Sequence, residues 1–216
     1  MEGFTIKQNI LLYTIALLIG GAYGYFDYPL WMFLVTVIPF ALFFLYIKLY
    51  PVFFTENMNQ VEAYLLANKK KPMYAFYYAL ANRHNEEVEV SFTLTMSKVK
   101  SIPGKAQLQT IYHLYKGNPE QAKEYLAELK PMDVKHYYDA LISVEEGQLN
   151  TARFLKERIK KQWYKDAIEV EINLKEGNYL EAYKFSELAV ANTKGLQRYI
   201  LIKNYEQEKL KELFTQ

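Results

Sequence analysis

The most regular pattern in the chain is a pair of long apolar stretches near its N-terminus. Segments 8–26 and 28–48 contain no charged side chain except Lys48 at the end of the second, and Asp27 separates them. A helix needs about 20 apolar residues to cross the hydrocarbon core of a membrane. Because the connection between the segments is very short, they predict two antiparallel spans, which together form a transmembrane hairpin over residues 1–50.

The charges that flank this predicted hairpin indicate its orientation. Lys7 precedes the first span, and Lys48 and Lys69–Lys71 follow the second, whereas the connection has no lysine or arginine. Positive flanks prefer the cytoplasmic side. We therefore expect a two-span protein of the cell membrane whose N-terminus and C-terminal domain are cytoplasmic. The alternative, a cleaved signal peptide over 1–25, is disfavoured because a second long span follows at once.

Small residues recur on one face of the first predicted span. Ala16, Gly20 and Gly24 are spaced four apart, which lets helix backbones approach closely. We expect this face to pack against the second span, and the alternatives are self-association or docking onto another membrane protein. Neither span has an internal acidic, basic or histidine side chain, which ion paths and intramembrane catalysis usually need. The hairpin is therefore typical of an anchor or docking element in the lipid bilayer.

From residue 55 onward the apolar positions follow a helical period and charged residues become frequent. A juxtamembrane linker helix is expected within 51–70, either near the membrane surface or covering the first face of the helices that follow. Segments that begin at Gly117, Gly147 and Gly177 then align at 30-residue intervals, each with an alanine five positions later. A glycine that ends one helix and a small residue that lets the next approach predict repeated helix hairpins. The predicted repeat domain covers 71–216, with repeats at about 71–100, 105–130, 135–161 and 165–191 and a capping helix over 195–213.

The first of these repeats is the least regular. Its turn has no glycine, and its second half, residues 86–99, has an ambiguous pattern. Alternate positions from Val88 to Met96 are apolar, as in a strand, whereas Val88, Phe92, Met96 and Val99 also share one face of a helix. We favour a helix, because a strand would have no partner strand in an otherwise helical chain.

The segment Gly177-Asn178-Tyr179-Leu180-Glu181-Ala182 resembles the turn of a tetratricopeptide repeat (TPR), and the other two turns keep its glycine and alanine positions. The period of 30 is shorter than the 34 residues usual in that family, and the family's early tryptophan is absent. The resemblance implies an all-α fold, an α-solenoid behind the transmembrane hairpin. It also implies a concave groove, lined by the first helix of each pair, that binds a protein or peptide.

Composition narrows the possible functions further. The chain has 216 residues, 51% of them hydrophobic, a net charge of +2 and no cysteine. This apolar content excludes a disordered chain, and the near-neutral balance argues against nucleic acid as a partner. Disulfides and thiolate metal sites are impossible without cysteine.

The sequence shows no pattern that points to catalysis. His84, His113 and His136 fall in different predicted elements and lack the spacing of a helical metal site. There is no glycine-rich phosphate loop and no nucleophile motif. We therefore expect neither an enzyme nor a cofactor or metal site.

Two sets of side chains are candidates for binding a partner. Lys105, Lys135 and Lys165 each stand twelve residues before a repeat glycine, so a stack of repeats aligns them along one edge. They form either a basic strip for acidic groups or an ordinary solvated edge. The second set consists of tyrosines outside the positions that are apolar in every repeat. Tyrosines suit interfaces because they bury area and keep a polar tip. Its members are Tyr115, Tyr137 and Tyr164.

These observations predict a membrane-anchored scaffold or adaptor that recruits or assembles a partner protein at the cytoplasmic face. The alternative is an accessory or regulatory subunit of a membrane enzyme or transporter, which it would contact through the transmembrane hairpin. The identity of the partner does not follow from the sequence.

Overall fold

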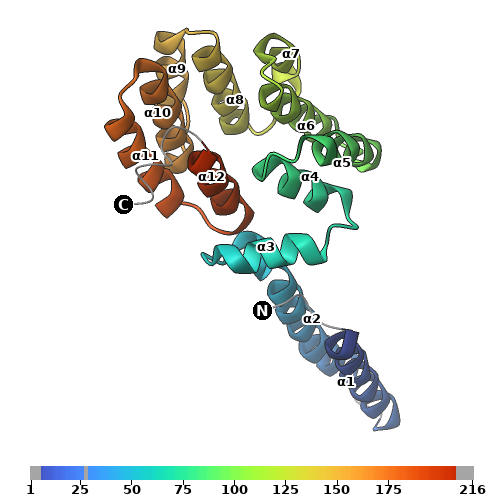
Figure 1. Ribbon diagram of the computed structural model, residues 1–216. Coiled ribbons are helices and arrows are strands. Elements are labelled where there is room, and N and C mark those ends of the chain that lie inside the picture. Colours follow the sequence, from blue (N-terminus) through green and yellow to red (C-terminus); the bar gives the residue numbers. More distant parts are fainter. Residues whose placement is uncertain (1–5, 27–28, 208–216) are drawn as a thin grey trace.

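The computed structural model describes residues 6–26 and 29–207, and within them all regular structure is helical, with no strand (Figure 1). The all-α prediction is therefore confirmed. Residues 208–213 of the predicted capping helix lie outside the described part. In chain order the helices are α1 (Ile6–Tyr25), α2 (Leu30–Phe53), α3 (Met58–Ala67), α4 (Pro72–Ala81), α5 (Asn85–Lys98), α6 (Ile102–Tyr115), α7 (Pro119–Lys123), the 3-10 turn η1 (Leu126–Glu128), α8 (Met132–Glu145), α9 (Leu149–Glu157), α10 (Gln162–Glu176), α11 (Tyr179–Ala191) and α12 (Gly195–Gln207).

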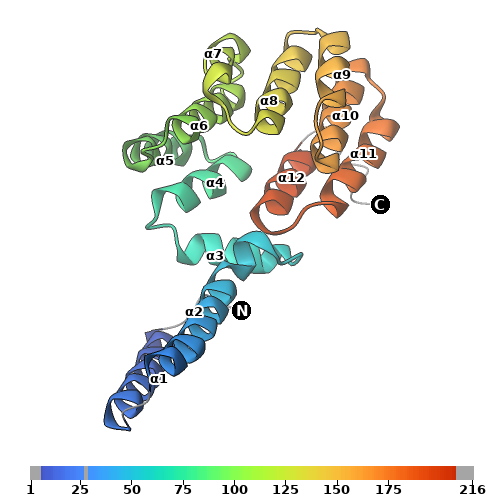
Figure 2. The same cartoon turned by 180° about the vertical axis from the view of Figure 1, so that it is seen from behind.

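The N-terminal helices α1 and α2 lie side by side and project from the rest of the molecule (Figures 1 and 2). The hydroxyl of Tyr23 on α1 donates to the Met32 carbonyl at 3.2 Å and lies 2.5 Å from Thr36 Oγ1 on α2. Among the described residues, one helical segment is long and apolar enough to cross a membrane, Leu34–Phe53 of α2. The first predicted span is helical as α1, but its crossing of a membrane stays a prediction.

The boundary after the second predicted span differs from the expectation. α2 continues through Pro51 to Phe53 rather than ending near residue 48, and Pro51 and Val52 are buried. The linker helix predicted within 51–70 is therefore shorter, because α3 starts only at Met58. Its start is set by Asn57, whose side chain accepts a hydrogen bond from the Gln60 N–H, as an N-cap does.

The repeat turns are built alike. Gly117, Gly147 and Gly177 have φ values of 72°, 76° and 79°. In each turn the N–H of the residue after the glycine donates to the carbonyl five residues earlier, at 2.7–2.9 Å. This is the Schellman arrangement, which satisfies helix-end carbonyls and requires a left-handed residue. The 30-residue spacing seen in the sequence thus corresponds to a repeated backbone turn.

The first repeat has the same turn although it lacks a glycine. Arg83 takes the left-handed position with φ of 55°, and the His84 N–H donates to the Ala79 carbonyl at 2.9 Å. The ambiguous segment after it forms α5, so the favoured helix is confirmed. Phe92 on α5 stacks on Tyr112 of α6 at 4.0 Å between ring centroids, which fixes the helical face toward the core.

One small side chain in each later repeat holds the two helices together. Ala122, Ala152 and Ala182 are all 0% exposed, and Val88 occupies the equivalent place in the first repeat, also at 0%. Around them the cores of neighbouring repeats merge through residues of both helices in each pair. The alanine column predicted from the sequence is therefore the close-approach point of each hairpin.

The second repeat departs from the others. Its second helix, expected to continue to about residue 130, ends as α7 at Lys123 and is followed by the short turn η1. Leu129 is then extended, with ψ of 136°. Lys130 stands before Pro131, where the helical conformation is disfavoured, so the chain cannot continue as a helix there.

The repeats form an arc that closes on itself. α12 packs on α10 and α11 through Leu201 and Tyr205, and its Tyr199 packs against Val61 of α3 and Ala81 of α4. Figures 1 and 2 both show α12 between the first and last repeats, with α3 beside it. Such an arrangement of packed helix pairs is compatible with an α-solenoid.

We predict that Gly147→Ala lowers the free energy of unfolding by about 1–2 kcal/mol, the cost of a left-handed residue with a Cβ. No described atom lies within 4 Å of the added carbon, so backbone strain alone produces the loss. The measurement is chemical denaturation of the full chain in detergent. Gln148→Ala, at the exposed next residue with φ of −88°, is the matched control and should be nearly neutral.

Candidate partner-binding surfaces

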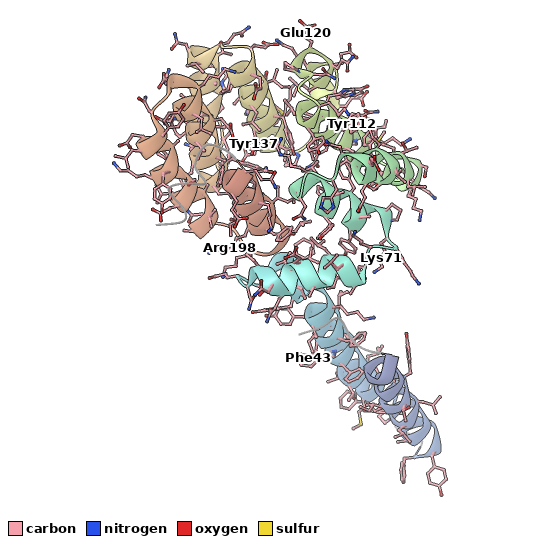
Figure 3. All side chains as sticks on the ribbon, viewed as in Figure 1. Phe43, Lys71, Tyr112, Glu120, Tyr137 and Arg198 are labelled. Atoms are coloured by element: carbon pink, nitrogen blue, oxygen red, sulfur yellow. The ribbon has the colours of Figure 1, made fainter. Side chains whose placement is uncertain are left out.

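The inner side of the arc, where the TPR resemblance places a binding groove, is filled by the protein's own aromatic side chains. Tyr137 of α8 packs against Tyr164 of α10, with 4.4 Å between ring centroids, and contacts the cores on both sides of α10. Figure 3 shows Tyr137 between α8 and α12. The hydroxyl groups of Tyr137 and Tyr138 lie deep, and burial raises the pKa of both phenols well above the usual value.

The arc is closed by polar contacts between its two ends. Asn82 at the end of α4 donates to the Tyr199 hydroxyl at 2.9 Å, and that hydroxyl donates to Glu62 of α3 at 3.3 Å. About two turns further along α12, Gln207 donates to the Ala81 carbonyl at 2.9 Å. Tyr199 is only 1% exposed, and burial raises the pKa of its phenol. The first repeat and α12 are therefore joined directly by side-chain hydrogen bonds.

Arg83 adds to this closure from its strained position. Its Nε donates to Gln207 Oε1 at 2.7 Å, and its guanidinium lies 6.0 Å from the centre of the Tyr115 ring. A left-handed residue other than glycine is unfavourable by about 1–2 kcal/mol. The side-chain contacts to α12 and α6 are interactions that a glycine at this turn would lack.

A second junction joins the end of the apolar helix α2 to the start of α12. The Gly195 N–H donates to the Thr55 carbonyl at 2.7 Å, and Thr55 is 3% exposed. A Cβ at Gly195 would lie 1.9 Å from the Val52 carbonyl oxygen, so only glycine fits without movement. Lys194 pairs with Glu56 at 3.1 Å and holds the pKa of that carboxyl below its usual value. The repeat domain therefore meets α2 directly instead of through a loose linker.

The three lysines of the predicted strip all lie in the first turn of first helices, on α6, α8 and α10. Lys105 is exposed, whereas Lys135 and Lys165 are partly covered. Lys165 lies 4.0 Å from Glu157, which offsets part of its charge. Lys105 is the most accessible of the three, and both interpretations, binding strip and solvated edge, stay open.

The three candidate tyrosines have different environments. Tyr164 is 6% exposed and belongs to the core between α8 and α10, so its proposed role at a partner surface is wrong for this arrangement. Tyr137 is partly buried in the interior. Tyr115 is closer to the surface, but its hydroxyl donates to Asn85 Oδ1 at 2.5 Å. Sequence position alone did not separate a tyrosine at the core edge from one at a free surface, because both occur just outside the apolar columns.

The small-residue face of α1 is turned away from α2. Ala16, Gly20 and Gly24 are exposed, and no described atom lies within 4 Å of a Cβ built on either glycine. The contact with α2 uses Tyr23 instead. The expectation that this face packs inside the hairpin is therefore wrong for the described residues. The other two possibilities, self-association through this face and docking onto another membrane protein, stay open.

Basic and acidic side chains of successive repeats form ion pairs on the surface. Lys123 to Glu146 and Arg153 to Glu176 are the same pair one repeat apart, at 3.0 and 2.5 Å. Surface pairs of this kind contribute at most about 1 kcal/mol each, far less than the shared apolar core.

His113 stacks on Tyr125, with 5.8 Å between ring centroids. Within residues 6–26 and 29–207, no three His, Asp or Glu side chains gather in a way that could hold a metal ion.

Comparison with known proteins adds no assignment. No family model, no curated protein and no solved structure matches this chain. The resemblance to tetratricopeptide repeats therefore rests on the residues of the turns and on the alanine column. Their geometry supports a helical-repeat fold and leaves membership of that family unconfirmed.

We predict that Gly195→Ala destabilises the protein more than Gly177→Ala. Both glycines are left-handed, but only Gly195 faces backbone, so its Cβ adds a steric cost of about 1–3 kcal/mol. Thermal unfolding of the two full-length variants in detergent measures the difference. Equal losses would show that α2 and α12 do not keep this close approach.

Proposed function

We propose that the protein is a membrane-anchored helical-repeat scaffold that recruits or assembles a partner protein at the cytoplasmic face of the cell membrane. The observation that carries the proposal is the junction of α2 with α12. A helix with the length and hydropathy of a membrane span ends against a buried Thr55 and against Gly195 of the repeat domain. A domain fixed in this way presents its surfaces at a constant distance from the membrane and at a constant angle to it.

Anchoring contributes by raising the local concentration of a bound partner at the membrane. It requires no chemistry from the scaffold itself, and the charged groups described above act as structural pairs. The proposal includes the two-span hairpin, the TPR-like character of the repeats and the cytoplasmic placement of both chain ends. Lysine flanks on both sides of the hairpin support that placement.

The filled interior directs the proposed contact to exposed side chains at the edge of the repeats. Helices in open solenoids bind peptides along their inner surface, but here Tyr137 and Tyr138 have buried hydroxyls and Tyr164 belongs to the core. We assign the partner to the edge formed by the first turns of α6, α8 and α10, here called the outer edge, where Lys105 is exposed. Its positive charge suits acidic side chains or a terminal carboxylate.

A second function is favoured by the exposed face of α1. Gly20 and Gly24 are uncovered in this chain, and small residues at this spacing allow close packing with another membrane helix. In this alternative the protein is an accessory subunit of a membrane enzyme or transporter. Contact then occurs mainly within the bilayer, and the repeat domain regulates the larger complex.

Photo-crosslinking in intact membranes separates the two functions. A benzophenone amino acid replaces Lys105 on the outer edge or Tyr13, which is 72% exposed and two turns before Gly20 on the same face. We expect the Lys105 position to crosslink one specific protein, and the exposed Glu187 position on α11 to serve as the control. Crosslinks formed only from the Tyr13 position would reject the scaffold and favour the accessory subunit.

The lysine strip has its own test in the same assay. The triple change of Lys105, Lys135 and Lys165 to Gln is expected to lower the crosslinking yield at a neighbouring outer-edge position, because it removes the positive charge of the edge. An unchanged yield would leave the strip as an ordinary solvated edge.

The proposed orientation is tested with a reporter enzyme fused after Gln216. We expect a reporter that is active only in the cytoplasm to be active, and one that is active only outside the cell to be silent, since both flanks of the hairpin carry lysine. Activity of the external reporter would overturn the orientation.

A further inference from the structure

Helix α3 has two faces of different character. Val61 and Leu65 are 1% and 0% exposed and pack against α4 and α12. The opposite side, here called the α3 outer face, is exposed to solvent and includes Leu66 at 45% exposure. Its members are Asn59, Ala63, Leu66, Ala67 and Lys70.

The α3 outer face is turned toward the side of the molecule from which α2 projects. α3 lies crosswise at the end of α2, with the repeat domain on its other side, in both views (Figures 1 and 2). The last residues of α2 and the one after it carry exposed aromatic rings, Phe53 at 58% and Phe54 at 48%. Phe54 also contacts Tyr46, with 5.4 Å between ring centroids. Tyr46 is itself 48% exposed, and tyrosine is enriched at the depth of lipid headgroups because its ring is apolar and its hydroxyl polar.

The charge around α3 is positive once internal pairs are counted. Residues 45–72 contain four lysines and two glutamates. Glu56 is paired with Lys194, and Glu62 accepts a hydrogen bond from Tyr199. Lys69 is offset by Glu87 at 3.0 Å, whereas Lys70 is exposed at the end of the outer face. Figure 3 shows Lys71 beside it, at the connection from α3 to α4.

We propose that the α3 outer face lies in the headgroup layer of a bilayer that contains anionic lipid. Leu66 and the alanines enter the apolar boundary, and Lys70 and Lys71 contact the lipid phosphates, as in an interfacial amphipathic helix. The proposal rests on α2 acting as the membrane anchor. It adds a second contact with the membrane, and two contacts at one junction set the tilt of the repeat domain.

The test uses single cysteines, since the natural chain has none. An environment-sensitive fluorophore is attached to Ala63→Cys on the outer face, to Leu42→Cys on α2 or to Gln121→Cys on α7. Gln121 is the control because it follows Glu120, which Figure 3 shows at the far end of the molecule. The full chain is placed in nanodiscs of phosphatidylcholine with phosphatidylglycerol, and lipids spin-labelled in the headgroup or in the acyl chain quench the emission.

We expect headgroup quenching at position 63, acyl-chain quenching at position 42 and neither at position 121. If position 42 is quenched and position 63 behaves like position 121, the headgroup contact is overturned while the anchor stands. If position 42 is also unquenched, the anchor itself fails. Blue-shifted emission at position 63 without lipid quenching would mean that protein covers the face, which also overturns the proposal.

Lipid charge provides the second arm of the experiment. Lys70→Gln combined with Lys71→Gln should shift the docking equilibrium away from anionic nanodiscs by about fivefold per lysine, seen as weaker quenching at position 63. Lys123→Gln combined with Lys175→Gln removes the same charge from α7 and α10 and should have no effect. Equal quenching in phosphatidylcholine alone and in anionic nanodiscs would overturn the requirement for anionic lipid.

Discussion

The close approach of α12 to the end of α2 is the contact on which the rest of the arrangement depends. Gly195 lies against the Val52 backbone, and from this point α12 extends between the first and last repeats. Its Tyr199 packs on α3 and α4, while Leu201 and Tyr205 pack on α10 and α11. One helix therefore completes the last repeat, closes the arc and fixes the domain to α2. Loss of this contact would uncover two apolar surfaces at once, so closure and anchoring are stabilised together.

The sequence predicted the repeat unit well because its determinants are local. The left-handed turn needs a glycine at one position, and the close approach of two helices needs an alanine five residues later. Both requirements recur at 30-residue intervals and were visible without a structure. Arg83 shows the limit of this signal. It takes the same left-handed turn without being glycine, and its side chain contacts Gln207 and Tyr115.

The surfaces of the protein were predicted less well, because they depend on contacts between residues far apart in the chain. Tyr115 and Tyr164 look alike in the repeat pattern, yet Tyr164 is buried by neighbouring helices whose angle the pattern does not specify. Likewise, the small-residue face of α1 was expected to meet α2, but Tyr23 sets a different contact face. The closure by α12 joins positions more than a hundred residues apart, such as Asn82 and Tyr199, and no periodicity in the sequence encodes it.

The closed interior also changes which part of the fold is available for recognition. An open solenoid binds its partner on an extended concave surface. Here the Tyr199 hydroxyl is used by Asn82 and Glu62, and the hydroxyl groups of Tyr137 and Tyr138 are buried. To open this interior, a partner would have to replace those internal contacts and uncover the apolar contacts of α12, whereas the exposed Lys105 is accessible without any rearrangement. The same closure that makes the inner surface costly to reach holds the outer edge at a constant geometry relative to α2, which is what the proposed scaffold role would require of a binding edge.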